Sequence, residues 1–144
     1  MTAQISDFLE YSLKAKPGDL TVDRMPPTDP HAKSYQEEFD FVVKNPTRTD
    51  FKGTAPTSQK FDVEVFFVGI DHETSVWKWS SGQKFSQIVT PVSIPAGQSW
   101  TPEQKVVWSF KAADIKDGKY RAVATFIPTG SKKGVTNFVI KSVQ

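Results

Sequence analysis

The sequence predicts an all-β protein, an antiparallel β-sandwich of about seven to nine strands. Three observations predict this class. Apolar and polar residues alternate along several short segments, as they do on strands with one buried face. Turn residues, including many of the 10 prolines and 8 glycines, interrupt these segments. Val, Phe, Thr and Trp are abundant while long Ala, Leu or Glu runs are absent, which favours strands over helices.

The first strand is expected at residues 8–14, where alternate positions are apolar, and it is interpreted as an edge strand. Turn chemistry at residues 16–19 ends it. Residues 24–33 carry three prolines without periodicity, which is typical of a connection along the surface or a sheet edge. Residues 37–44 alternate well and predict a strand, which the turn at residues 45–50 closes.

The next two segments differ in how clearly they fit a strand pattern. Residues 51–58 contain a glycine and a proline and predict a short edge segment. Residues 61–70 predict a central strand, because Phe61, Val63 and Val65 share one face opposite acidic residues. A polar turn at residues 69–73 then joins this strand to the following one as a hairpin.

A strand is expected over residues 76–87, and the fold is expected to be organised around it. Trp77 and Trp79 stand two residues apart, so both indoles point to one face of an extended backbone. A helix would separate the two rings by about 200°. After a turn, Phe85 resumes the alternation. Trp77→Ala is therefore expected to destabilise the fold far more than Lys78→Ala.

Four further segments complete the sandwich, beginning with loose alternation at residues 88–94 and a turn at residues 95–98. Residues 106–110 place two apolar rings and a valine on one face. Residues 120–126 follow a tight turn, and the last strand is expected at residues 135–143.

The step Asp117-Gly118-Lys119-Tyr120 refines the fold class. A tyrosine that opens a strand directly after a tight turn is typical of the tyrosine corner of immunoglobulin-like sandwiches. The prediction is therefore an antiparallel immunoglobulin-like β-sandwich.

Bulk properties exclude several classes of function. The 144 residues suit one domain, and the formal net charge of +2 gives no reason to expect nucleic-acid binding. No cysteine is present, so disulfides, thiolate nucleophiles and thiolate metal ligands are excluded. The first ten residues do not resemble a signal peptide, and no run reaches the roughly 20 apolar residues of a membrane span. We expect a cytoplasmic protein without membrane association.

Catalysis finds no support in the sequence. The two histidines are His31, in the proline-rich connection, and His72, in a predicted turn. Asp71 and His72 are adjacent in sequence, which does not provide the opposed geometry of a catalytic triad, and no nucleophile elbow is present. Neither calcium-loop nor zinc-site spacing occurs, and no glycine-rich loop precedes a helix. We expect no enzyme activity, metal or cofactor.

A protein-binding surface is the remaining class of site. Aromatic side chains are frequent at interface hot spots, and Trp100, which follows a Pro-Ala-Gly turn, is the ring expected nearest the surface. Three loops are candidates for partner contact, at residues 69–73, 80–84 and 95–101. The candidate residues on or beside these loops are Asp71, His72, Glu73, Trp79, Ser81, Gln83, Phe85 and Trp100.

Several motifs occur in one order along the chain: Phe-Val-Val-Lys-Asn-Pro-Thr at 41–47, Ser-Gln-Lys-Phe-Asp-Val at 58–63, Val-Trp-Lys-Trp-Ser at 76–80, Phe-Ser-Gln at 85–87, Ile-Pro-Ala-Gly-Gln at 94–98 and Asp-Gly-Lys-Tyr at 117–120. Together they resemble the bacterial intracellular proteinase inhibitor family of the BsuPI type. The resemblance implies an immunoglobulin-like sandwich and a cytoplasmic protein that restrains an endogenous serine protease. It implies no reactive-site motif that can be placed on this chain.

We therefore expect one domain over residues 1–144. Residues 1–35 supply an edge strand and the proline-rich connection, residues 36–128 the family-like core, and residues 129–144 the last strand. The expected function is inhibition of an intracellular, subtilisin-like serine protease by a loop or by strand addition.

Two other functions stay open. One is an interaction or scaffold module that pairs through an edge strand, including pairing with a second copy of itself as a homodimer. The other is a carbohydrate-binding module, which requires Trp79, Phe85 or Trp100 to form a flat, exposed platform.

Overall fold

The computed structural model describes residues 5–23, 34–130 and 133–143, and it confirms the all-β class. The helical segments among these residues are single 3₁₀ turns, η1 (Ile5–Phe8), η2 (Trp79–Gly82), η3 (Ala112–Asp114) and η4 (Ile127–Thr129). The strands described are β1 (Glu10–Lys16), β2 (Leu20–Val22), β3 (Ser34–Lys44), β4 (Phe51–Ala55), β5 (Phe61–Val68), β6 (Glu73–Lys78), β7 (Thr90–Ile94), β8 (Ser99–Trp100), β9 (Val106–Lys111), β10 (Gly118–Phe126) and β11 (Lys133–Ser142).

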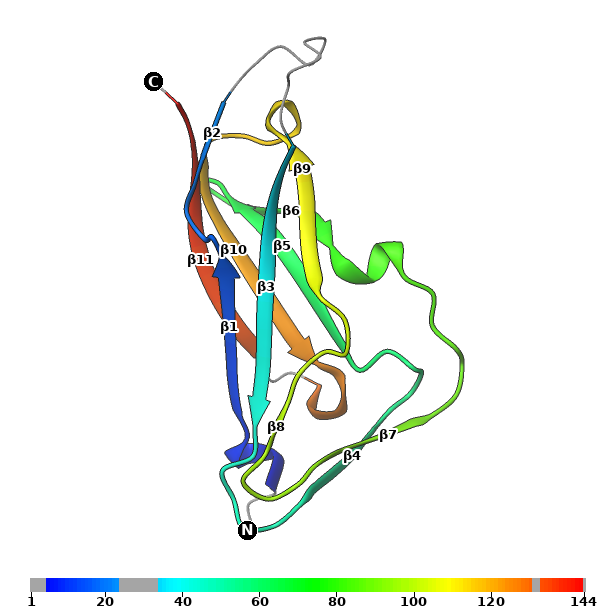
Figure 1. The fold of residues 1–144 in the computed structure, drawn as a ribbon. Helices are drawn as coiled ribbons and strands as arrows, with labels where there is room; N and C mark the ends of the chain where they lie inside the picture. The colour runs from blue at the N-terminus through cyan, green and yellow to red at the C-terminus, as the bar shows by residue number, and fades with distance from the viewer. Residues whose placement is uncertain (1–4, 24–33, 131–132, 144) are drawn as a thin grey trace.

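Two sheets form the sandwich and a two-stranded ribbon extends it (Figure 1). In the first sheet β3 pairs with β1 on one side and with β8 and β9 on the other. The second sheet has the order β2-β11-β10-β5-β6, and β4 pairs with β7 in the ribbon. The pairing is antiparallel as predicted, except that β2 lies parallel to β11. The short strands β2 and β8 were not expected from the sequence, and the proline-rich connection at 24–33, with His31, lies outside the described residues.

The core lies between the two sheets, where the predicted alternation places the apolar side chains. Phe39 on β3 contacts Phe138 on β11 and Trp77 on β6, each at 6.1 Å between ring centroids. Val63 and Val65 on the central strand β5 are fully buried. Burying an apolar side chain of this kind contributes about 1.5–3 kcal/mol relative to leaving it exposed. The alternation that predicted the strands thus also supplies the energy that holds the layers together.

The predicted tyrosine corner is present. The hydroxyl of the buried Tyr120 donates to the carbonyl oxygen of Lys116 at 2.7 Å and accepts from its amide nitrogen at 3.2 Å. The phenol thereby fixes the turn that leads into β10, and it supports the immunoglobulin-like class.

Tyr120→Phe should lower the free energy of unfolding by about 1–2 kcal/mol, because the backbone groups of Lys116 lose their side-chain partner while ring packing is kept. Chemical denaturation of the variant and the wild type measures this difference. An unchanged denaturation midpoint would show that the corner contributes nothing to stability.

Asn45, in the resemblance motif at 41–47, is a structural residue. Its buried side-chain amide donates to the carbonyl oxygens of Thr49 and Ile94, both at 2.9 Å, and its Oδ1 accepts from the Thr47 amide at 3.1 Å. The amide of Gly97 donates to the Asn45 carbonyl at 2.9 Å. Asn45 therefore joins the turn after β3 to the end of β7.

The strand expected over residues 76–87 is confirmed only as far as Lys78. Trp79 begins η2, and residues 83–89 form no strand, so Phe85 does not resume the alternation. A β-bulge also interrupts β6, since Val65 pairs with Trp77 and the adjacent Phe66 pairs with Ser75. Both indoles nevertheless face the core, with Trp79 buried and Trp77 half-buried.

Candidate functional site

Two of the three predicted loops lie at opposite ends of the β5–β6 hairpin (Figure 1). The turn at 69–73 follows Val68, where β5 ends, whereas the loop at 80–84 lies beside Asp62, where β5 begins. The structure therefore does not bring Asp71, His72 and Glu73 together with Ser81 and Gln83.

The turn at 69–73 is tight and polar. The Gly69 amide donates to the His72 carbonyl at 3.0 Å, and Glu73 forms an ion pair with Arg121. Asp71 and His72 are exposed. Among the residues that the structure describes, no group of three or more His, Cys, Asp and Glu side chains is arranged to hold a metal ion.

The turn at 95–98 is also held by hydrogen bonds, and it lies apart from the other two loops. The Gln98 amide donates to the Pro95 carbonyl at 2.9 Å, and Gly97 has a φ of 73°, which favours glycine. Ala96 donates its amide to Asp50 at 2.9 Å. In Figure 1 this turn lies between β7 and β8, at the lower end of the molecule.

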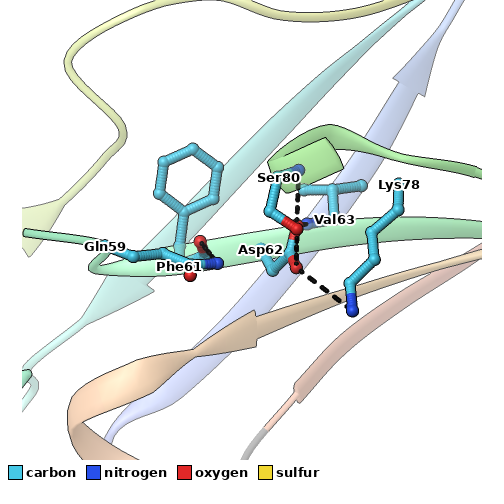
Figure 2. Close-up of polar contacts among 6 residues, drawn as sticks. All are labelled: Gln59, Phe61, Asp62, Val63, Lys78 and Ser80. Atoms are coloured by element: carbon cyan, nitrogen blue, oxygen red, sulfur yellow. Dashed lines mark hydrogen bonds and ion pairs between the residues drawn. The ribbon is translucent and has the colours of Figure 1, made fainter. Parts of the chain in front are cut away.

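Asp62 holds the beginning of the loop at 80–84 (Figure 2). Its Oδ1 accepts from the Ser80 amide at 3.1 Å, and its Oδ2 accepts from the Ser80 hydroxyl at 2.7 Å. Lys78 Nζ lies 3.8 Å from the same Oδ2. The carboxylate thus satisfies two donors at the first turn of η2 and ends the extended path of β6.

Ser58 holds the other end of the loop. The Ser58 amide donates to the Ser86 carbonyl at 3.0 Å, and the Ser86 amide donates to the Ser58 hydroxyl at 2.9 Å. Residues 80–86, fixed at both ends, are called the clamped loop below. Between the two fixed ends, the side chains of Ser81, Gln83 and Lys84 are exposed.

Aromatic side chains support the clamped loop from below. Trp79 stacks on Phe61 at 4.2 Å between ring centroids, and Phe85 lies 5.8 Å from Trp79. Trp100, on β8, packs against Phe61 at 5.9 Å and against Phe126 at 4.9 Å. Trp79, Gln83, Phe85 and Trp100 line one hollow of about 190 Å³, so the structure brings these four candidates together.

The aromatic rings do not form the flat platform that carbohydrate binding requires. Trp79 is buried, and its ring plane is tilted by 55° to that of Phe85. Trp100, the ring expected nearest the surface, is half-buried and packs against the core. Trp79, Phe85 and Trp100 therefore do not form a flat, exposed carbohydrate-binding platform.

Hydrogen bonds hold the clamped loop at both of its ends. Sequence reasoning missed Asp62 and Ser58, which fix the loop. Asp62 lies 18 residues before Ser80, and Ser58 lies 28 residues before Ser86, so only the folded chain brings each pair together.

No helix in the described residues is long and apolar enough to span a membrane.

The two-layer architecture and the tyrosine corner define an immunoglobulin-like β-sandwich, here with a loop anchored at both ends. Residues 27–130 match the model of the BsuPI family, described as intracellular proteinase inhibitor. The chain belongs to this family. Proteinase inhibitors, as this family is described, are in general not enzymes.

Two solved structures illustrate the similarity, both at low sequence identity. A β-glucosidase from Erythrobacter marinus aligns with 92% of this chain at 10% identity and a TM-score of 0.45. The CARDB domain of a Pyrococcus furiosus protein aligns with 99% of this chain and 100% of its own length, at 16% identity and a TM-score of 0.39. The chain spans 15% of the length of the Erythrobacter enzyme. Curated protein sequences gave no match.

Proposed function

We propose that this protein inhibits a subtilisin-like serine protease in the cytoplasm by placing the clamped loop over the active-site cleft of the protease. The observation that carries the proposal is this loop, fixed at both ends, inside the region that matches the proteinase inhibitor family. Ser81 and Gln83 would contact the protease directly, because their side chains are exposed between the two fixed ends.

Fixed ends matter because an inhibitor loop that is already ordered loses less conformational entropy when it binds. No disulfide is available for this purpose, since the sequence has no cysteine. The hydrogen bonds from Ser80 to Asp62 and between Ser58 and Ser86 replace it. Trp79 and Phe85 add apolar contacts beneath the loop, and Trp100 closes the hollow on the side of β8.

Titration of subtilisin with the protein tests the proposal. We expect protease activity to fall in proportion to added protein until the two are equimolar. Undiminished cleavage of a peptide substrate at micromolar protein would contradict the function.

Asp62→Ala tests the role of the fixed loop. The variant frees the amide and hydroxyl of Ser80, so inhibition should weaken by about tenfold as the loop loses pre-organisation. His72→Ala is the matched control, because His72 lies at the opposite end of the hairpin. Equal inhibition constants for the Asp62→Ala variant and the wild type would show that the clamp does not matter.

A second candidate function is self-association through an edge strand. Among the described residues, β6 is the end strand of its sheet and pairs with β5 alone, and it is exposed apart from Trp77. In an antiparallel pair of β6 strands, Glu73 of one copy would face Lys78 of the other. Sedimentation velocity over a range of concentrations tests this, and a single monomeric species at high concentration would contradict it.

A further inference from the structure

Two large apolar side chains that are adjacent in sequence are exposed just beyond the clamped loop. Ile88 is 67% exposed and Val89 is 64% exposed. In the part of the chain that the structure describes, the other exposed large apolar side chains stand singly, as Ile70 does in the turn after β5. Single exposed apolar residues are ordinary, whereas an adjacent pair is a feature that needs an explanation.

The segment that carries this pair is held on both sides. It follows Ser86, which is bonded to Ser58, and it precedes Thr90, the first residue of β7, which pairs with Ala55 of β4. The Thr90 hydroxyl donates to the carbonyl oxygen of Ile88 at 2.9 Å. The two side chains are therefore presented to solvent by a backbone with fixed ends. Figure 1 shows this connection between η2 and β7 running along the outside of the molecule, at the right of the view.

The composition around the pair fits burial in a cleft. Residues 85–91, Phe-Ser-Gln-Ile-Val-Thr-Pro, contain no charged side chain, although 24% of the whole chain is charged. Burying a charge without a partner is costly, so an uncharged segment enters a dehydrated cleft at a lower desolvation cost than a charged one would.

We propose that residues 87–89 form the part of the inhibitory surface that enters the protease cleft, with Ile88 and Val89 occupying apolar subsites of a serine protease. This inference rests on the proposed function and adds the contact residues to it. The clamped loop then lies over the cleft next to the inserted residues, and the two exposed aliphatic side chains supply the apolar area that becomes buried on binding.

Charge substitutions test the inference. Ile88→Asp and Val89→Asp should each raise the inhibition constant for subtilisin by about 30-fold or more, as loss of an interface hot spot does. The thermal unfolding midpoint should stay the same, because both side chains are exposed in the free protein. Ile70→Asp is the matched control, since Ile70 is an exposed isoleucine in the turn at the far end of the β5–β6 hairpin, and its inhibition constant should change by less than about twofold.

The outcomes separate the two proposals. If the wild type inhibits subtilisin and both Asp variants inhibit equally well, residues 87–89 are not the contact and the inference is wrong, while the proposed function stands. If Ile70→Asp weakens inhibition as much as Ile88→Asp does, the effect comes from added charge and the inference is again wrong. If the wild type does not inhibit subtilisin, both proposals fail together.

Discussion

Glu37→Gln should stabilise the protein by about 3 kcal/mol at pH 8 and leave its stability nearly unchanged at about pH 4.5. Glu37, on β3, is fully buried. Its Oε1 accepts from the Gly18 amide at 2.9 Å, whereas its Oε2 has no hydrogen-bond partner among the described residues. Burial raises the pKa of this carboxyl from 4.5 to about 7, the Gly18 hydrogen bond opposes the shift, and the nearby Asp19 adds to it.

The sign follows from the protonation of the two states. The folded protein keeps the Glu37 proton up to about pH 7, whereas the unfolded chain releases it near pH 4.5, so unfolding releases a proton between these values. Wild-type stability therefore falls as pH rises through this window and the loss is complete above it. Glutamine does not titrate, so the stability of Glu37→Gln does not fall in this pH window.

Urea denaturation at several pH values, for the variant and the wild type, measures the difference. Glu38→Gln is the control, because it removes a carboxylate from the neighbouring position, whose side chain points to the other face of β3. It should change stability by less than about 0.5 kcal/mol. Parallel stability profiles for Glu37→Gln and the wild type would show that the buried carboxyl does not titrate in this window.

Trp79→Ala should lower the free energy of unfolding by about 3–5 kcal/mol, as large deletions in a core do. The indole is 6% exposed and stacks on Phe61 at 4.2 Å. Trp77→Ala should cost less, because Trp77 is half-buried, and Lys78→Ala should cost less than about 0.5 kcal/mol.

Chemical denaturation of the three variants measures how much free energy of unfolding each one loses. Because Trp79 also lies beneath the clamped loop, Trp79→Ala should weaken protease inhibition even at temperatures where the variant is folded. Equal and small losses at Trp77 and Trp79 would contradict the assignment of Trp79 to the core.

The strands were predictable because a half-buried strand leaves a pattern of period two in the sequence. The same alternation also places two polar side chains on the buried face, although neither was predicted to lie in the core. Phe39, Phe41 and Val43 are buried at alternate positions of β3, and the same parity leads back to Glu37, inside β3, and on to Asn45, just after it. Both are fully buried. Residue 37 was expected to begin the strand and residue 45 to lie in the following turn, because alternation alone does not show whether an inward polar side chain has a partner such as Gly18 or Thr49.

The site was less predictable because it depends on long-range contacts. The alternation around Trp77 and Trp79 continues to Phe85 in sequence, but the bonds from Ser80 to Asp62 turn the chain into η2. Residues 88–94 were read as one strand, which would have placed Ile88 in a sheet. Because β7 begins at Thr90, Ile88 and Val89 are instead left in the exposed connection before it.

The strands that lie outside the family match limit how far the protein can be shortened. The match to the family covers residues 27–130, which excludes β1, β2 and β11. A fragment cut to that match would uncover β10 on one side and β3 on the other, leaving two long unpaired strand edges that invite aggregation. We therefore expect β1, β2 and β11 to protect the strand edges of residues 27–130 from aggregation. A soluble, cooperatively folding fragment of residues 27–130 would show that these flanking strands are dispensable.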